Sequence, residues 1–175
     1  MFKEIKSYYF LKNIKESKKI KNKLLDFLEE MPPSKYGGVT KTDWALPKDF
    51  NRPYVKYFAD IIRPYMNTIT QKLKLDNWVI HNMWFQQYEK NSYHKWHTHA
   101  SVQFSSVYYL ELPNKKTSTQ FKNIVDNNVF SIDVKEGDLL LFPSCLLHRS
   151  PKNKSKKRKS IIAFNSSFMG EGEIL

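Results

Sequence analysis

Three of the five histidines in this 175-residue chain lie within one short stretch, at His94, His97 and His99. The residues that follow, SVQFSSVYYL, alternate in the manner of a β-strand. Because alternate residues of a strand point to the same face, His97 and His99 are expected to share a face and to converge on one metal ion. His94 lies three residues before His97, so we expect it on the other strand face or in the preceding turn. There it would lie at the mouth of a pocket or on the surface, away from the metal.

A mononuclear metal site needs a further ligand from another strand, and His148 is the candidate. It follows the apolar run DLLLFP, a late strand that a jelly roll would place beside the early one. Imidazole suits iron, zinc, copper or nickel, and a three-sided set with open positions suits non-haem iron(II). The alternative is that these histidines are structural, since a pair two residues apart is common by chance.

A candidate carboxylate anchor comes ten residues after His148, at Arg158, with Ser160 two residues further on. The arginine would supply a bidentate fork and the serine one more donor, both on one face of a strand. The alternative is that Arg158 is one more member of a basic loop. If Arg158 is not the anchor, the next candidate is Lys159.

Helical periodicity precedes the strand-like part of the chain. Apolar spacing predicts a helix over 13–31, ended by Pro32, and a second over about 53–75, which Pro64 should kink or split. After Asn77 the segments are short, β-branched and aromatic, and polar turns separate them.

This order predicts a single α+β domain over 1–175. Its core would be a jelly roll over about 77–170. The helices of about 1–76 would pack on one side of that core.

The composition is basic, with 29 lysines and arginines against 17 acidic residues and a net charge of +12. This balance favours anionic partners. Six basic residues lie in the stretch Lys152–Lys159, which we expect to be a solvated loop. Nucleic acid is a less favoured partner, because no aromatic residues are interleaved with that run.

The expected environment is the cytoplasm. The one cysteine, Cys145, excludes an internal disulfide framework, and its apolar surroundings predict a buried thiol. The N-terminus lacks a signal-like apolar segment, and no run is long enough to span a membrane, so no membrane partner is expected.

Four motifs, taken in order, resemble a known family: QQYEKNSYHKWHTH, FSSVYYLELP, EGDLLLFPSCLLHRSPKN and RKSIIAFN. The chain resembles the 2-oxoglutarate- and iron(II)-dependent oxygenases over roughly 78–168, and more narrowly a small bacterial and phage group related to prolyl hydroxylases. The resemblance implies a cupin-like double-stranded β-helix core. It also implies iron(II) held by His97 and His148, 2-oxoglutarate held by Arg158 with Ser160, and dioxygen as co-reactant. Tyr88 lies where such enzymes often have a tyrosine that touches the cosubstrate.

The sequence departs from that family at His99, where the superfamily has aspartate or glutamate. The third metal ligand is therefore His99, a water, or a group from elsewhere in the chain. Gln103 lies on the same expected strand face and would approach the metal or the substrate, or else be a core-facing polar residue with a partner. Asn165 is a further candidate for the substrate pocket.

The resemblance implies a dioxygenase that hydroxylates an unactivated C–H bond of a peptide or protein side chain, phage-encoded and active in the host cytoplasm. Two alternatives remain open. One is a cupin-type three-histidine dioxygenase that needs no 2-oxoglutarate. The other is a non-enzymatic jelly-roll module that binds nucleic acid or other anions through its basic loop.

Overall fold

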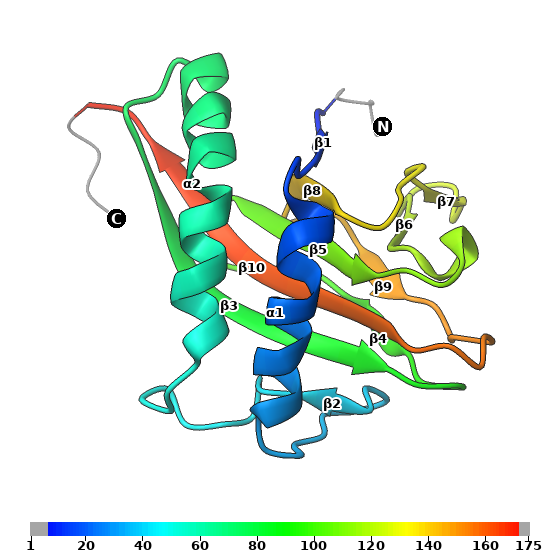
Figure 1. The fold of residues 1–175 in the computed structure, drawn as a ribbon. Coiled ribbons are helices and arrows are strands. Elements are labelled where there is room, and N and C mark those ends of the chain that lie inside the picture. Colours follow the sequence, from blue (N-terminus) through cyan, green and yellow to red (C-terminus); the bar gives the residue numbers. More distant parts are fainter. Residues whose placement is uncertain (1–6, 172–175) are drawn as a thin grey trace.

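Two antiparallel sheets and two helices form the fold in residues 7–171, the part of the chain that this computed structural model describes (Figure 1). The larger sheet has the strand order β1 (Phe10–Asn13), β8 (Asp138–Pro143), β5 (Phe104–Glu111), β10 (Lys159–Met169), β3 (Asn77–Tyr88) and β2 (Lys41–Thr42). The smaller sheet has the order β4 (His94–His97), β9 (His148–Ser150), β6 (Gln120–Lys122) and β7 (Val129–Ser131).

Both helices lie on the same face of the larger sheet (Figure 1). Helix α1 (Ser17–Glu30) buries one apolar stripe, and α2 (Pro53–Leu73) buries another along its length. Pro64 lies inside α2, and the helix continues for more than two turns beyond it. The proline therefore does not split the helix. None of the helices in the described residues is long and apolar enough to cross a membrane.

Two strands come from the segment that was expected to be only helix and loop. Strand β1 pairs with β8 at one end of the larger sheet, and β2 pairs with β3 at the other. Each pairing joins residues far apart in the sequence, so the local pattern of apolar residues carries little signal for either strand.

The residues of β10 alternate between two separate cores. Ile162 and Phe164 pack on the helical side of the larger sheet, whereas Ile161 packs between the two sheets. Odd-numbered residues of β10 therefore face the smaller sheet, and even-numbered residues face the helices. This alternation decides which side chains of β10 can reach a site between the sheets.

Cys145 is exposed, so the prediction of a buried thiol is wrong. It lies between β8 and β9, where the backbone N–H of Leu146 donates to the carbonyl of Pro143. The apolar run around it is interrupted by this turn, and turn residues lie at the surface.

Candidate metal centre

Strand pairing places His97 and His148 side by side. His97 ends β4 and His148 begins β9, and the two residues lie directly opposite each other in the antiparallel pair. Their ring centroids are 4.2 Å apart. The two histidines that are 51 positions apart in sequence are thus brought together by backbone register alone.

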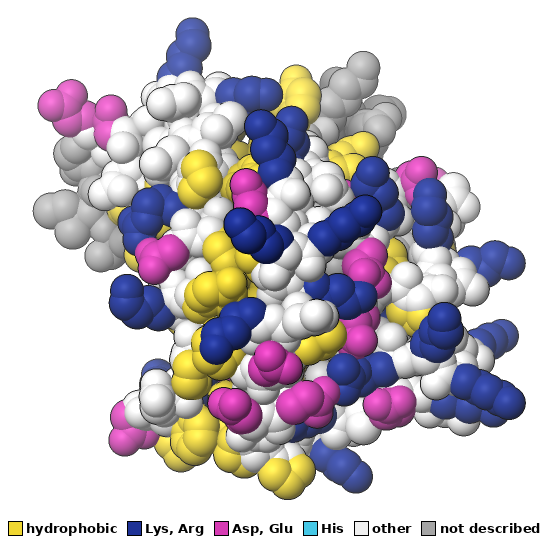
Figure 2. Space-filling model, in the orientation of Figure 1, with side chains coloured by type: hydrophobic (Ala, Val, Ile, Leu, Met, Phe, Trp, Pro, Cys, Tyr) yellow, Lys and Arg dark blue, Asp and Glu magenta, His cyan; other side chains and the backbone are white. Residues whose placement is uncertain are grey.

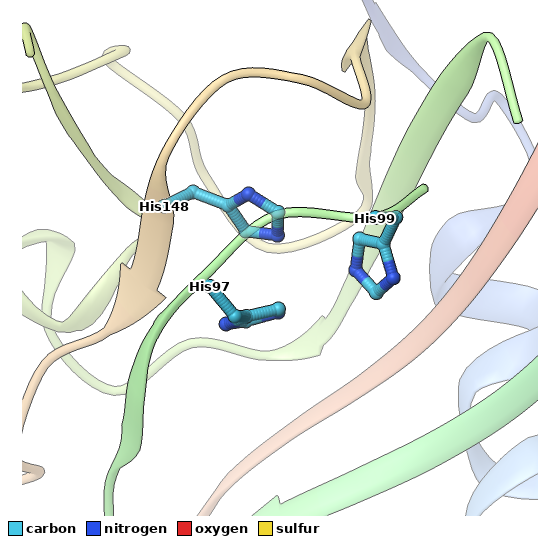
Figure 3. A group of neighbouring side chains, drawn as sticks. All are labelled: His97, His99 and His148. Atoms are coloured by element: carbon cyan, nitrogen blue, oxygen red, sulfur yellow. The ribbon is translucent and has the colours of Figure 1, made fainter. Parts of the chain in front are cut away.

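His99 completes a group of three. It lies two residues beyond the end of β4, where its backbone N–H donates to the carbonyl of Ser144 at 3.1 Å. One nitrogen from each of His97, His99 and His148 lies within 4.8 Å of the others. Figure 3 shows the three rings turned toward a shared space, two from one segment and the third from β9.

Backbone carbonyls fix the ring orientation of two of these histidines. Nδ1 of His97 lies 2.8 Å from the carbonyl oxygen of Lys95, and Nδ1 of His148 lies 2.7 Å from that of Leu146. Because a carbonyl only accepts, Nδ1 carries the proton in both rings, which leaves each Nε2 with a free lone pair. Metal-binding histidines are commonly oriented in this way.

Burial keeps all three rings neutral near pH 7. Burial lowers the pKa of His148 to about 3, with neighbouring His97 adding to the effect. The same two causes lower the pKa of His99 to about 4, and burial lowers the pKa of His97. Neutral imidazole is the form that binds metals. Three neutral nitrogen donors in this arrangement fit a divalent first-row transition metal.

His94 lies in β4 rather than in the preceding turn, which was one of its two expected positions. The register shifts between His94 and His97, so the two residues pair with Ser150 and His148, which are only two apart. This bulge brings the rings of His94 and His97 to 4.2 Å. Burial, followed by the neighbouring histidines, lowers the pKa of His94 to about 4.

The histidines line a cavity between the two sheets, which has a volume of about 40 Å³. An open groove of about 600 Å³ lies next to it. His94, Arg149 and Ser150 line both spaces, so they form the mouth of the cavity. His94 therefore lies at the mouth of a pocket rather than on the open surface, which were the two places expected for it.

Arg158 and Ser160 do not line this cavity. The Arg158 guanidinium donates from Nε to Oε2 of Glu111 at 2.8 Å, and it also pairs with Glu29 at the end of α1. The Ser160 hydroxyl donates to the same Glu111 oxygen at 2.5 Å. Both side chains thus bind carboxylates of the protein itself, on the helical side of the sheet.

Lys159 is the cation of β10 that faces the cavity. It is 1% exposed, and its ammonium donates to the carbonyl of Thr117 at 2.7 Å and to the Ser150 hydroxyl at 2.8 Å. No carboxylate of the described residues forms an ion pair with it. Burial lowers its pKa to about 7.

Tyr88 lines the cavity. Its ring centroid is 4.9 Å from the Lys159 ammonium, and its hydroxyl donates to Oε1 of Gln86 at 2.5 Å. Burial raises the pKa of the Tyr88 phenol, so the phenol remains protonated. Tyr88 and Lys159 thus form one end of the cavity.

The two substrate-pocket candidates differ in position. Asn165 is buried, accepts from the Ser105 hydroxyl at 3.0 Å, and has its amide nitrogen 3.5 Å from Nδ1 of His99. Gln103 is exposed, and its Oε1 accepts from the backbone N–H of Phe168 at 2.8 Å. Asn165 thus contacts the histidine group, whereas Gln103 bonds to the backbone outside the residues that line the cavity.

Several cavity residues were not among the sequence candidates. They include Trp84, Gln86, Arg149 and Ser150. Trp84 and Gln86 lie four and two residues before Tyr88 in the same strand, so their side chains point to the same face as Tyr88. This alternation could have identified them from the sequence. Arg149 and Ser150 follow a candidate ligand directly, but only the pairing of β9 with β4 shows what they face.

A family model described as phytanoyl-CoA dioxygenase matches residues 87–161, which is less than half of the chain. The matched segment contains the three histidines, Arg158 and Lys159. No curated protein sequence matches the chain.

Several solved structures share the fold. A viral collagen prolyl hydroxylase from Paramecium Bursaria Chlorella virus-1, in a 2-oxoglutarate complex, has a TM-score of 0.65 at 14% identity, over 94% of this chain and 97% of its own. A prolyl-4-hydroxylase from Pseudomonas putida gives 0.62 at 14%, over 94% and 93%. HygX from Streptomyces hygroscopicus, with nickel and 2-oxoglutarate bound, gives 0.67 at 12%, over 91% and 82%.

At these identities the structural likeness establishes the fold. The prediction of an α+β double-stranded β-helix with helices on one side is confirmed. The family match over residues 87–161 agrees with the predicted resemblance to the 2-oxoglutarate- and iron(II)-dependent oxygenases, and the solved structures agree with it in fold.

Proposed function

We propose that this protein is an iron(II)- and 2-oxoglutarate-dependent oxygenase. The observation that carries the proposal is the composition of one cavity, which holds three neutral histidines and a buried lysine that no carboxylate of the described residues pairs with. The histidines suit a divalent metal, and the lysine suits the far carboxylate of a dicarboxylate cosubstrate. The family match and the shared fold support this combination.

His97, His148 and His99 would hold the iron, each through a ring nitrogen. When bound, the metal would supply activation of dioxygen coupled to oxidative decarboxylation of 2-oxoglutarate. Imidazole at His99, in place of the carboxylate found in the superfamily, leaves the site one unit more positive, which favours an anionic cosubstrate. The amide of Asn165, 3.5 Å from the His99 ring, would help to orient that ring.

Lys159 takes the role that was expected of Arg158. A buried ammonium without a counter-ion is costly, which is why its pKa falls to about 7. An incoming carboxylate would restore the charged form and would replace the missing partner. Tyr88 and Ser150 surround the same ammonium and would complete the carboxylate site.

The cavity of about 40 Å³ holds about three waters, which is less than a five-carbon dicarboxylate needs. We therefore expect the His94 ring, at the mouth, to change rotamer when 2-oxoglutarate binds. Side-chain changes of this kind are common on binding, while the backbone moves little. The strands that carry Lys159 and the three histidines would remain in place.

The reaction that we propose is hydroxylation of an unactivated C–H bond in a peptide or protein side chain. The likeness to prolyl hydroxylases, among them one from Trichoplax adhaerens in complex with a peptide fragment, supports this choice. The cavity mouth supports it too, because the groove at His94 and Arg149 is open enough to admit an extended chain.

Turnover of 2-oxoglutarate provides the test. The iron(II)-loaded protein, given 2-oxoglutarate and ascorbate in air, is expected to release succinate and carbon dioxide in equal amounts even without substrate. This is slow uncoupled turnover, in which ascorbate supplies the electrons that substrate would otherwise provide. Succinate is measured by chromatography, and protein kept with zinc instead of iron serves as the control. Metal binding without any succinate would overturn the proposal and would favour the three-histidine dioxygenase that needs no cosubstrate.

A further inference from the structure

The groove outside the cavity carries cations and aromatic rings. Its lining comes from β4 and from the segment that begins with β9, and includes Tyr93, Lys95, Trp96, Arg149 and Lys152. None of its eight lining residues is acidic. It joins the cavity at His94, Arg149 and Ser150, so a chain that lies in the groove can place one side chain at the histidines.

The groove cations have no carboxylate partners among the described residues. The ion pairs of the described residues involve cations outside the groove, such as Lys21 with Glu136 and Arg63 with Asp60. Figure 2 shows the helical face, where basic and acidic side chains are interspersed and no histidine is visible. An uncompensated group of cations beside the candidate metal site favours an anionic substrate.

Contacts of Arg149 and Asn153 hold the arginine and the basic loop in position. The Arg149 guanidinium carbon lies 4.4 Å from the Trp96 ring centroid, and its Nε donates to Oε1 of Gln120 at 2.9 Å. Asn153, which is fully buried, donates to the carbonyls of Tyr88 and Lys157 and so fixes the loop that carries Lys152. The cations are therefore presented by an ordered surface, which reduces the entropy lost on binding.

The aromatic rings favour a peptide over a nucleic acid. One face of Trp96 is covered by the Arg149 guanidinium. The Tyr93 ring packs against backbone, since a carbon added at Gly38 would lie 2.9 Å from its Cε1. Nucleobases need free ring faces for stacking. β4 is also the edge strand of its sheet, and extended peptides commonly bind beside edge strands.

We infer that the groove binds an acidic peptide segment and directs one of its side chains to the three histidines. This rests on the proposed function and specifies its substrate class. Carboxylates of the peptide would contact Lys95, Arg149 and Lys152, and apolar or proline side chains would lie against the exposed edges of Trp96 and Tyr93.

Binding of short labelled peptides to the full chain tests this inference. A fluorescein-labelled repeat of glutamate and proline is expected to bind, more weakly as salt rises, while a lysine–proline repeat does not bind. The double variant Lys95→Gln/Lys152→Gln is expected to weaken binding on the order of tenfold at low salt. The matched control Lys18→Gln/Lys19→Gln removes the same charge from exposed positions of α1 and is expected to bind as wild type does.

Three results would overturn the inference: equal binding of the lysine–proline repeat, equal loss in both double variants, or tighter binding of a ten-nucleotide oligothymidylate than of the acidic peptide. Iron(II) and 2-oxoglutarate binding are measured on the same wild-type preparation. If those ligands bind and the acidic peptide does not, the substrate class is wrong while the proposed function stands. If they do not bind either, the proposed function itself fails.

Discussion

Replacing Lys159 by methionine is expected to abolish 2-oxoglutarate binding while iron(II) binding stays close to that of wild type. Methionine has a similar length and is apolar, so it fills a position that is 1% exposed without leaving a hole. A bound carboxylate would then be buried without a partner, at a cost of about 3–5 kcal/mol, or more than a hundredfold in affinity. Anaerobic titration calorimetry with each ligand measures both affinities.

Arg158→Met is the matched control, because it alters the cation that directly precedes Lys159 in the chain. Its guanidinium pairs with Glu111 and Glu29 rather than lining the cavity, so 2-oxoglutarate should bind normally. The variant is expected instead to unfold at lower denaturant concentration, because Glu111 loses a partner. Loss of 2-oxoglutarate binding in Arg158→Met, with retention in Lys159→Met, would restore Arg158 as the anchor.

The difference between Arg158 and Lys159 is one of strand parity. The sequence analysis favoured both Arg158 and Asn165, which are seven positions apart and so face opposite sides of a regular strand. Asn165 faces the histidines, and Lys159 shares its parity. Both faces of β10 are buried, and apolar residues such as Ile161 and Ile162 occupy both of them. An alternation of apolar and polar residues therefore does not show which face of the strand points into the cavity.

Much of the fold follows from local pattern. The two helices, the late strands and the candidate group of three histidines were predicted from spacing and residue type. The bulge between His94 and His97 was not, because it depends on how β4 pairs with β9. The same holds for strand β1, which exists through its pairing with β8.

Removing His97 or His148 is expected to strip the metal. In His97→Ala or His148→Ala, iron(II) affinity should fall by roughly a hundredfold or more, since loss of a ligand should cost more than loss of the groups that orient one. His81→Ala is the control, because the His81 ring contacts Ser167 and lies outside the group of three. Equilibrium dialysis against iron(II) under nitrogen measures the affinities.

His99 distinguishes a three-histidine site from a site with two. His99→Ala should weaken iron binding if the ring is a ligand, and His99→Asp should keep binding by restoring the carboxylate found in the superfamily. Undiminished iron affinity in His99→Ala would contradict the assignment of His99. His97 and His148 would then remain as the protein ligands, with water or another group in the third position.

The most direct test of the central claim is a visible spectrum recorded without oxygen. Iron(II) and 2-oxoglutarate added together to the wild-type protein are expected to give a charge-transfer band that neither ligand gives alone. The band should be missing in His148→Ala, which lacks a metal ligand, and in Lys159→Met, which lacks the carboxylate anchor. A featureless spectrum of the folded wild-type protein at saturating concentrations of both ligands would contradict the account.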